Sequence, residues 1–189
     1  MCGRYYIADE DSAAELQAII EQVNRRGTAV KTGEIYPTDT VPVLANSRAK
    51  VIAPFAMKWG YTLPSGKHII NARSETAEAK PLFRDGLLER RCLIPASNYF
   101  EWDKDKVKYA IRSPDSPILY MAGIYRFENS LPVFTILTRE PDPSIAFIHN
   151  RMPVILRPEA KNDWLNMRYA ASDVIRVAIS GVSYSSAHC

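Results

Sequence analysis

Cysteine is scarce in this chain of 189 residues, and its spacing is irregular. The three cysteines, Cys2, Cys92 and Cys189, are an odd number at wide intervals. That pattern argues against a disulfide framework and matches no zinc-ligand spacing. The chain also lacks a long apolar run, and acidic residues between positions 9 and 15 occupy the place where a signal peptide needs its hydrophobic segment. The sequence therefore predicts a cytosolic protein with no membrane span, no metal and no cofactor.

A strong excess of either charge sign is also missing. Lys and Arg number 24 and Asp and Glu 21, so the formal net charge is +3 and the isoelectric point is about 8.7. This mild basicity permits a nucleic-acid partner without requiring one. Hydrophobic residues make up 47% of the chain, enough for a sizeable core, and no linker, repeat or shift in composition divides it. We expect one domain over residues 1–189.

Short segments rich in β-branched and aromatic residues, separated by turn residues, dominate the chain. They predict strands over residues 4–7, 36–44, 51–59, 69–71, 92–95, 98–102, 108–112, 118–127, 131–138, 152–156 and 174–179. Helical patterns predict a helix from a capping box at Ser12 to Gly27, a helical region over 74–90 interrupted at Pro81 and Gly86, and a helix that begins at Pro158. The expected fold class is α+β, with a curled, barrel-like, mainly antiparallel β-sheet core and peripheral helices.

The first four residues, Met1-Cys2-Gly3-Arg4, carry the most distinctive chemistry. Methionine aminopeptidases remove Met1 when the next residue is small, which leaves Cys2 with a free α-amine beside its thiol. The two groups titrate at about 7.7 to 8.0 and about 8.5, so both are partly nucleophilic near neutral pH. Such an aminothiol condenses with an aldehyde to an imine, and the sulfur then closes a thiazolidine ring. The alternative is an incidental cysteine at a terminus, so a functional Cys2 requires an activating partner elsewhere.

Two segments place polar groups where the pattern expects apolar ones. Residues 71–75 present the Asn71 amide and the Arg73 guanidinium at the end of a strand, although a solvated helix cap explains them equally well. Residues 98–102 surround Glu101 with aromatic side chains. A buried Glu101 would have a raised pKa and suit a general base or acid, whereas an exposed one would be a surface ion-pair residue.

A third segment, residues 149–153, holds His149 and Arg151. His149 is suited to proton transfer near neutral pH, or else is a structural histidine. Arg151, together with Arg4 and Arg73, would give three guanidiniums for phosphate contacts. Trp59, followed by a glycine, is either a core residue that ends a strand or a flat face for a nucleobase.

Taken together, these segments resemble the SRAP family, named for SOS-response-associated peptidases and regarded as abasic-site processing proteins. The matching motifs follow in family order through about residue 165: Met1-Cys2-Gly3-Arg4, Tyr36-Pro37 with Pro42-Val43, Trp59-Gly60, Asn71-Ala72-Arg73-Ser74-Glu75, Arg91-Cys92-Leu93-Ile94-Pro95-Ala96, Phe100-Glu101-Trp102, Phe134-Thr135-Ile136-Leu137-Thr138 and His149-Asn150-Arg151-Met152-Pro153. The end of the chain departs from the family, since it lacks an asparagine- and proline-containing tail.

The resemblance implies that Cys2 captures the ring-opened aldehyde of an abasic site in single-stranded DNA as a thiazolidine, which protects the lesion. Glu101 would orient and deprotonate the amine, His149 would assist ring opening and release, and Asn71 would hold the N-terminal residue or the sugar. The implied DNA-binding residues are Arg4, Pro37, Trp59, Arg73, Trp102, Thr138 and Arg151. We expect a monomer that is associated with the nucleoid when bound to DNA.

Three alternatives remain open from the sequence. Met-Cys-Gly also begins amidotransferases with an N-terminal nucleophile, so a glutaminase is one of them. A non-covalent module for single-stranded DNA, in which Cys2 is incidental, is the second and predicts salt-sensitive binding that ignores abasic sites. The third is a peptidase that removes its own Met1, which we interpret as maturation rather than the main function.

Overall fold

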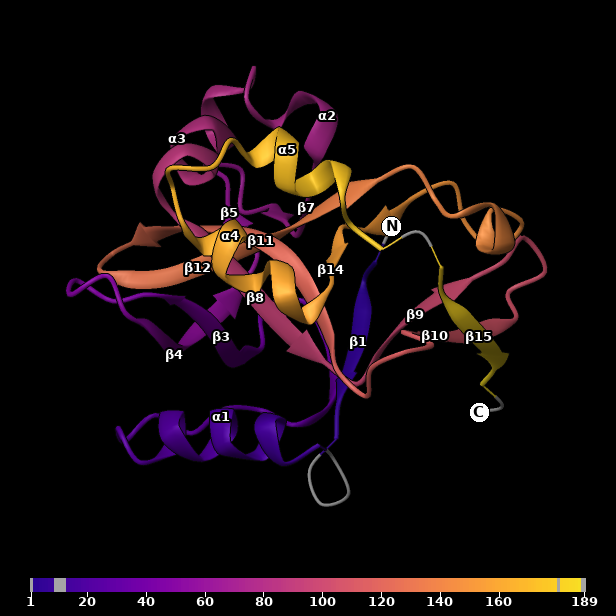
Figure 1. Cartoon of the computed structure of the whole chain (residues 1–189), viewed down its shortest axis with the longest axis horizontal. Helices are drawn as coiled ribbons and strands as arrows, with labels where there is room; N and C mark the ends of the chain where they lie inside the picture. Colours follow the sequence, from indigo (N-terminus) through magenta and orange to yellow (C-terminus); the bar gives the residue numbers. More distant parts are fainter. Residues whose placement is uncertain (1, 9–12, 180, 188–189) are drawn as a thin grey trace.

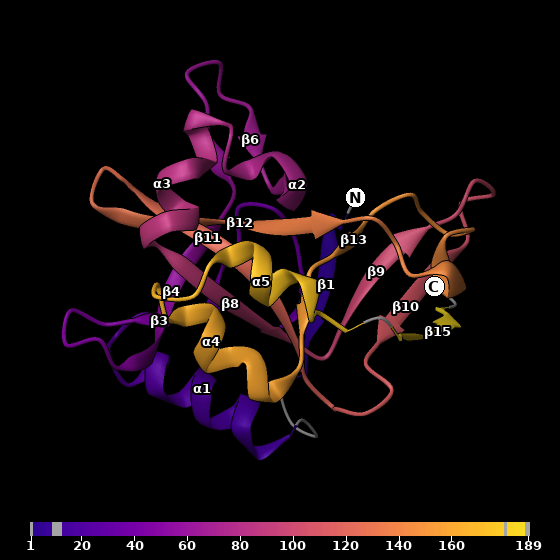
Figure 2. The same cartoon turned by 45° about the horizontal axis from the view of Figure 1, so that its top comes forward.

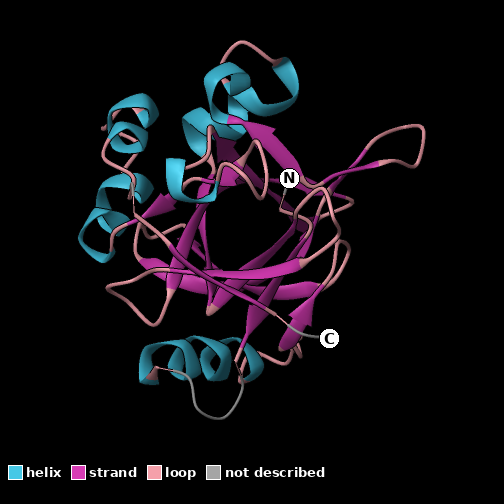
Figure 3. Ribbon diagram, turned by 90° about the vertical axis from the view of Figure 1, so that its right-hand side faces the viewer, coloured by secondary structure: helices cyan, strands magenta, loops and turns pink. Residues whose placement is uncertain are grey.

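A closed ring of five strands forms the centre of the computed structural model, which describes residues 2–8, 13–179 and 181–187. The ring order is β12-β4-β3-β8-β11, and β11 closes it by pairing with β12. All of these pairings are antiparallel except β12 with β4, which is parallel. The ring strands are β3 (Thr40–Asn46), β4 (Ile52–Trp59), β8 (Arg91–Ala96), β11 (Leu119–Glu128) and β12 (Leu131–Arg139). Figure 3 shows these strands around the core with the helices outside them.

A second sheet of five strands, in the order β15-β10-β9-β1-β2, extends from one side of the ring (Figure 1). Its strands are antiparallel and comprise β1 (Arg4–Ile7), β2 (Gly33–Ile35), β9 (Asn98–Trp102), β10 (Lys108–Arg112) and β15 (Ser183–Ser186). Shorter strands are β5 (Tyr61–Thr62), β6 (His68–Ile69), β7 (Asn71–Arg73), β13 (Met152–Pro153) and β14 (Ile155–Leu156). β7 runs parallel to β12, which attaches it to the barrel.

The helices lie around the sheets, as expected for peripheral helices (Figure 2). α1 (Ala14–Asn24) packs on β3 and β4 through four buried apolar residues at helical spacing, Leu16, Ile19, Ile20 and Val23. The others are α2 (Ser74–Ala77), α3 (Pro81–Glu89), α4 (Lys161–Leu165) and α5 (Ala171–Arg176), with 3-10 turns η1 (Pro143–Ile145) and η2 (Pro158–Ala160). No helix in the described ranges is long and apolar enough to cross a membrane.

The observed fold confirms the expected α+β class with its curled, mainly antiparallel core, but some local predictions are wrong. The strand predicted over 36–44 begins only at Thr40, because residues 37–38 form a turn. Residues 174–179 are not a closing strand, because α5 covers residues 171–176 and buries Ala171 and Val174 on one face. Gly86 does not interrupt the helix over 81–89, because its missing Cβ lets α3 approach β11, where an added Cβ would lie 3.1 Å from Ile124 Cβ. Pro81 does start α3, as the sequence indicates. The predicted cap at Ser12 lies outside the described residues.

Candidate functional site

Cys2 lies completely buried just before β1, where the second sheet meets the barrel. The Asn71 amide Nδ2 donates a hydrogen bond of 2.9 Å to the Cys2 carbonyl, which ties the terminus to β7. The Cys2 thiol lies 3.6 Å from the Arg4 carbonyl, to which it donates. Burial, and then the charge of Glu101, raise the pKa of the Cys2 thiol far above its ordinary value. Burial therefore disfavours the thiolate form of Cys2 in this structure.

Glu101 is also buried, with only 4% of its surface exposed, at the end of β9. Burial raises the pKa of its carboxyl group, and the charge of His149 is among the smaller effects that oppose this shift. The sequence analysis required Glu101 to be buried if it is to act as a general base or acid, and the structure meets this condition. A desolvated carboxylate binds a proton more strongly, which raises its pKa. Arg4 lies opposite Phe100 in the β1–β9 pair, so this pairing brings Cys2, which precedes β1, to the end of β9 that carries Glu101.

His149 belongs to a turn that Arg151 fixes. The backbone N–H of Arg151 donates to His149 Nδ1 at 3.0 Å. The Arg151 guanidinium binds both carboxylate oxygens of Glu75, at 2.9 and 2.7 Å, and donates to the Thr138 carbonyl at 2.7 Å. Burial opposes ionisation of Glu75, but the hydrogen bonds and charge of Arg151 hold its pKa below the ordinary value. Arg151 therefore supports the His149 turn as well as offering positive charge.

Arg4 lies between two aromatic rings, with its guanidinium carbon 4.5 Å from the Tyr36 centroid and 5.1 Å from that of Trp102. Its Nη1 also pairs with Glu34 at 3.2 Å. Arg4 is opposite Phe100 in the β1–β9 register, so it shares the sheet face of Phe100 and Trp102, whereas Glu101 points to the other face. Arg4 and Trp102 therefore lie on the opposite face of the second sheet from the Glu101 carboxylate.

Two of the predicted DNA-binding residues, Trp59 and Thr138, are buried in this structure, and their contact with DNA stays a prediction. Trp59 is fully buried in the barrel, where its ring lies parallel to Phe134 with centroids 6.4 Å apart and its Nε1 donates to the Ile70 carbonyl at 3.1 Å. Thr138 is also fully buried, and its carbonyl receives the Arg151 guanidinium. In this conformation neither side chain is exposed to a base or a phosphate.

The remaining predicted contacts surround the site at its edge. Arg73 ends β7 with an exposed side chain, directly beside Thr138 in the parallel register with β12. Pro37 is half-buried in the turn between β2 and β3, where Thr38 takes a positive φ of 77°. The structure thus brings Cys2 into hydrogen-bonding contact with Asn71. Glu101 interacts electrostatically with both Cys2 and His149, and the Arg73 side chain stays exposed.

The sequence analysis missed three aromatic residues that lie on the face of Glu101: Tyr109, Phe147 and Tyr184. The alternation in residues 108–112 indicates that Tyr109 shares a face with Ile111, but not that this face adjoins Glu101. The pairing of β9 with β10 supplies that information. Within the described ranges, no group of three His, Cys, Asp or Glu side chains gathers to hold a metal ion.

A cavity of about 1140 Å³ lies elsewhere and is lined by residues such as Phe55, Tyr125 and Met167. None of the residues proposed for the site lines it. Ligand pockets are usually concave and apolar, but the groups with chemistry to perform are gathered around Cys2. We therefore place the candidate site at Cys2, where buried reactive groups and an accessible arginine lie together.

The chain is similar to known proteins in both sequence and fold. The family model described as SOS response associated peptidase (SRAP) matches residues 1–185. Abasic site processing protein YoqW of Bacillus subtilis is 31% identical over 191 residues, covering 93% of this chain and 85% of the relative. Abasic site processing protein YedK of Escherichia coli is 26% identical over 194 residues, covering 96% and 86%. A crystal structure of a Bordetella bronchiseptica protein shares the fold at a TM-score of 0.77 and 22% identity, covering 100% of both chains.

Proposed function

This chain belongs to the SOS response associated peptidase (SRAP) family, and on that premise we propose that it processes abasic sites in single-stranded DNA. Cys2, once Met1 has been removed, would capture the ring-opened aldehyde of the lesion as a covalent thiazolidine. The observation that carries this proposal is the burial of Cys2 against Asn71, in a site where Glu101 and His149 also act electrostatically. An incidental terminal cysteine would not need such surroundings.

The proposed reaction begins at the amine. The Cys2 α-amine adds to the aldehyde carbon, and loss of one water leaves an imine. Glu101, with its raised pKa, is suited to take a proton from the amine and return it to the departing hydroxyl. His149 would move the proton that opens the deoxyribose ring to its aldehyde form.

Ring closure then uses the thiol. The sulfur forms a bond to the imine carbon while the thiol proton passes, through Glu101, to the nitrogen, so no further atom is lost. Because burial raises the pKa of the thiol, attack by free thiolate is disfavoured and the thiol depends on a neighbouring base. The product differs from the two reactants by a single water molecule.

Positioning would come from groups that hold the terminus and the DNA. Asn71 fixes the Cys2 carbonyl, which directs the amine and thiol into the site. Arg73 is exposed and suited to a phosphate, and Arg4 with Trp102 offers a cation and an aromatic face. Arg151 retains a mainly structural role in this proposal, because Glu75 already occupies its guanidinium.

The test is incubation of the untagged protein with a single-stranded oligonucleotide that carries one abasic site, followed by a denaturing gel and intact mass. We expect an adduct of protein plus DNA minus one water. Cys2→Ala and a form with extra residues before Cys2 should form none, whereas Cys92→Ala is the matched control, because Cys92 is a buried thiol in the barrel. Absence of an adduct from the wild type, or an equally stable one from Cys2→Ala, would sink the proposal, and glutamine hydrolysis without DNA would then be measured.

A further inference from the structure

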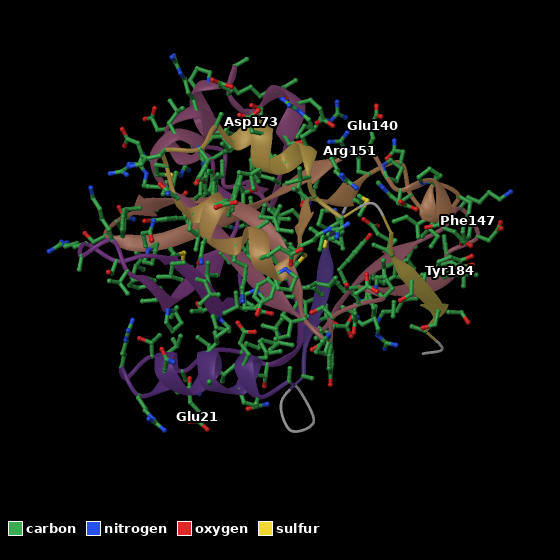
Figure 4. The ribbon with its side chains drawn as sticks, viewed as in Figure 1. Glu21, Glu140, Phe147, Arg151, Asp173 and Tyr184 are labelled. Carbon is green, nitrogen blue, oxygen red and sulfur yellow. The ribbon has the colours of Figure 1, made fainter. Side chains whose placement is uncertain are left out.

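Three aromatic residues from different segments meet on the surface beside the site. Tyr109 on β10, Phe147 after η1 and Tyr184 on β15, called here the aromatic cluster, make mutual contacts with ring centroids 5.4 to 5.9 Å apart. Their rings are inclined by 66° to 88°, an edge-to-face arrangement. Phe147 is 55% exposed and Tyr184 46% exposed, and Figure 4 shows both at the end of the molecule formed by β10 and β15.

The strand register places this cluster on the same sheet face as the buried carboxylate. Tyr109 lies directly opposite Glu101 in the β9–β10 pair, and Tyr184 lies opposite Ile111 in the β10–β15 pair. Residues directly opposite each other, and residues two apart on a strand, point to the same side. Phe147 precedes His149 by two positions. The aromatic cluster therefore continues from the Glu101 and His149 side of the site towards the sheet edge.

Packing of the η1 segment does not account for the exposure of these rings. Ile145 and Ile148 anchor that segment, since they are only 2% and 4% exposed, whereas Phe147 between them points outward. Several exposed aromatic rings in one patch are unusual for a surface without a ligand. The patch thus fits a ligand with flat apolar faces.

The charges near the cluster indicate which part of a nucleic acid would bind there. Asp103 accepts a hydrogen bond from the Tyr109 hydroxyl at 3.4 Å, and Asp142 caps η1 by accepting from Ser144 N at 2.9 Å. Carboxylates disfavour phosphates, but every unpaired base has an apolar face that stacks on an aromatic ring. We propose that the aromatic cluster stacks unpaired bases of the DNA strand on one side of the abasic nucleotide. This inference rests on the proposed function for the identity of the strand.

The first test measures affinity for undamaged single-stranded oligonucleotides, which need no covalent step. Phe147→Leu retains an apolar side chain but removes the ring, so we expect affinity to fall by about 5-fold to 150-fold, the range for losing one stacked base. The fold-change should be similar at low and high salt, because stacking releases few counterions. Phe127→Leu is the matched control, since Phe127 is 62% exposed on β11. Thermal unfolding of both variants shows whether either change disturbs the fold.

The second test leaves the protein unchanged and alters the DNA. Tetrahydrofuran spacers replace the bases on one side of a central position while the phosphates remain, and a second oligonucleotide carries them on the other side. We expect the wild type to bind one of these two oligonucleotides more weakly than it binds the unmodified strand. Phe147→Leu should bind that oligonucleotide and the unmodified strand equally well. The proposal would be overturned if the wild type bound the unmodified strand and both spacer oligonucleotides with equal affinity. It would also be overturned if Phe127→Leu and Phe147→Leu lost the same affinity for the unmodified strand, which would leave the cluster a packing feature. Adduct formation is scored separately, so failure of the covalent chemistry and failure of base stacking give different results.

Discussion

At the scale of single residues, Glu101 combines a cost to stability with a use in chemistry. Burial raises the pKa of its carboxyl group, so the folded protein binds this proton more tightly than the unfolded chain does. Between the two pKa values the unfolded state holds fewer protons, so the free energy of unfolding falls as pH rises. Reactivity has the opposite trend, because only the carboxylate can accept a proton from the Cys2 amine.

We therefore predict that Glu101→Gln separates the two effects. The rate of adduct formation should fall by about 100-fold to 10,000-fold, the usual contribution of a general base, and should lose the rise with pH that Glu101 gives the wild type. Thermal stability above the pKa of Glu101 should be equal to or higher than that of the wild type. Single-turnover gels across a pH series and thermal unfolding provide the measurements. Glu159→Gln, an exposed glutamate on η2, is the control and should change neither.

Trp59, which is fully buried, and Trp102, which is half-buried, give a second prediction. Trp59→Phe should lower the free energy of unfolding by about 1–3 kcal/mol, because it leaves a cavity in the barrel, without weakening binding to single-stranded DNA. Trp102→Ala should weaken binding to single-stranded DNA with little change in the free energy of unfolding, since its half-buried ring faces Arg4 at the surface. Denaturant unfolding and oligonucleotide affinity distinguish them. Weaker DNA binding by Trp59→Phe at unchanged stability would restore Trp59 as a stacking residue.

At the scale of elements, local pattern predicts strands well where both ends carry turn residues. The predicted strands over 98–102 and 108–112 match β9 and β10 residue for residue, because Asp103, Lys104 and Asp105 form the turn between them. Residues 174–179 were assigned to a strand because Val174, Ile175 and Val177 are β-branched. Their actual helix, α5, is set by burial of Ala171 and Val174, which depends on tertiary neighbours. Propensity could not reveal that packing.

Close packing of the barrel strands gives a prediction for Gly123 on β11. A Cβ added there would lie 2.5 Å from Ile94 Cδ1 and 3.0 Å from the Thr135 carbonyl oxygen. Gly123→Ala should therefore reduce the free energy of unfolding by about 1–3 kcal/mol through overpacking. Gly181→Ala is the matched change, because an added Cβ there meets no atom within 4 Å. Denaturant unfolding of both measures the difference, and equal stability would show that Ile94 moves aside freely.

At the scale of the whole molecule, the site exists because two sheets meet. Asn71 belongs to the barrel through β7 and β12, whereas Glu101 belongs to the second sheet, and Cys2 precedes that sheet's β1. The hydrogen bond between Asn71 and Cys2 joins residues 69 positions apart. Motifs in the sequence supplied the residue types, but strand pairing decided which groups meet. That is why the local pattern left Trp59 open between a core role and a stacking role, and why it missed the aromatic cluster.

The charge of the molecule leads to the final prediction, which concerns salt. A net charge of +3 and three arginines near the site, two of them in ion pairs with Glu34 and Glu75, allow few phosphate contacts. The slope of log affinity against log salt should be about −2 or shallower for a single strand, at roughly −0.7 per contact, and Arg73→Gln should reduce it by about 0.7.

Titrations over a range of salt concentrations measure this slope, and Arg25→Gln is the control because Arg25 lies exposed on the outside of the molecule, just after α1. A slope steeper than about −4 would mean that more cations bind phosphates than the site contains. An unchanged slope for Arg73→Gln would remove Arg73 from the DNA path. The expected result is a shallow slope for the wild type and a still shallower slope for Arg73→Gln. Base stacking and the covalent bond, rather than charge, would then be the main interactions that hold the protein on the lesion.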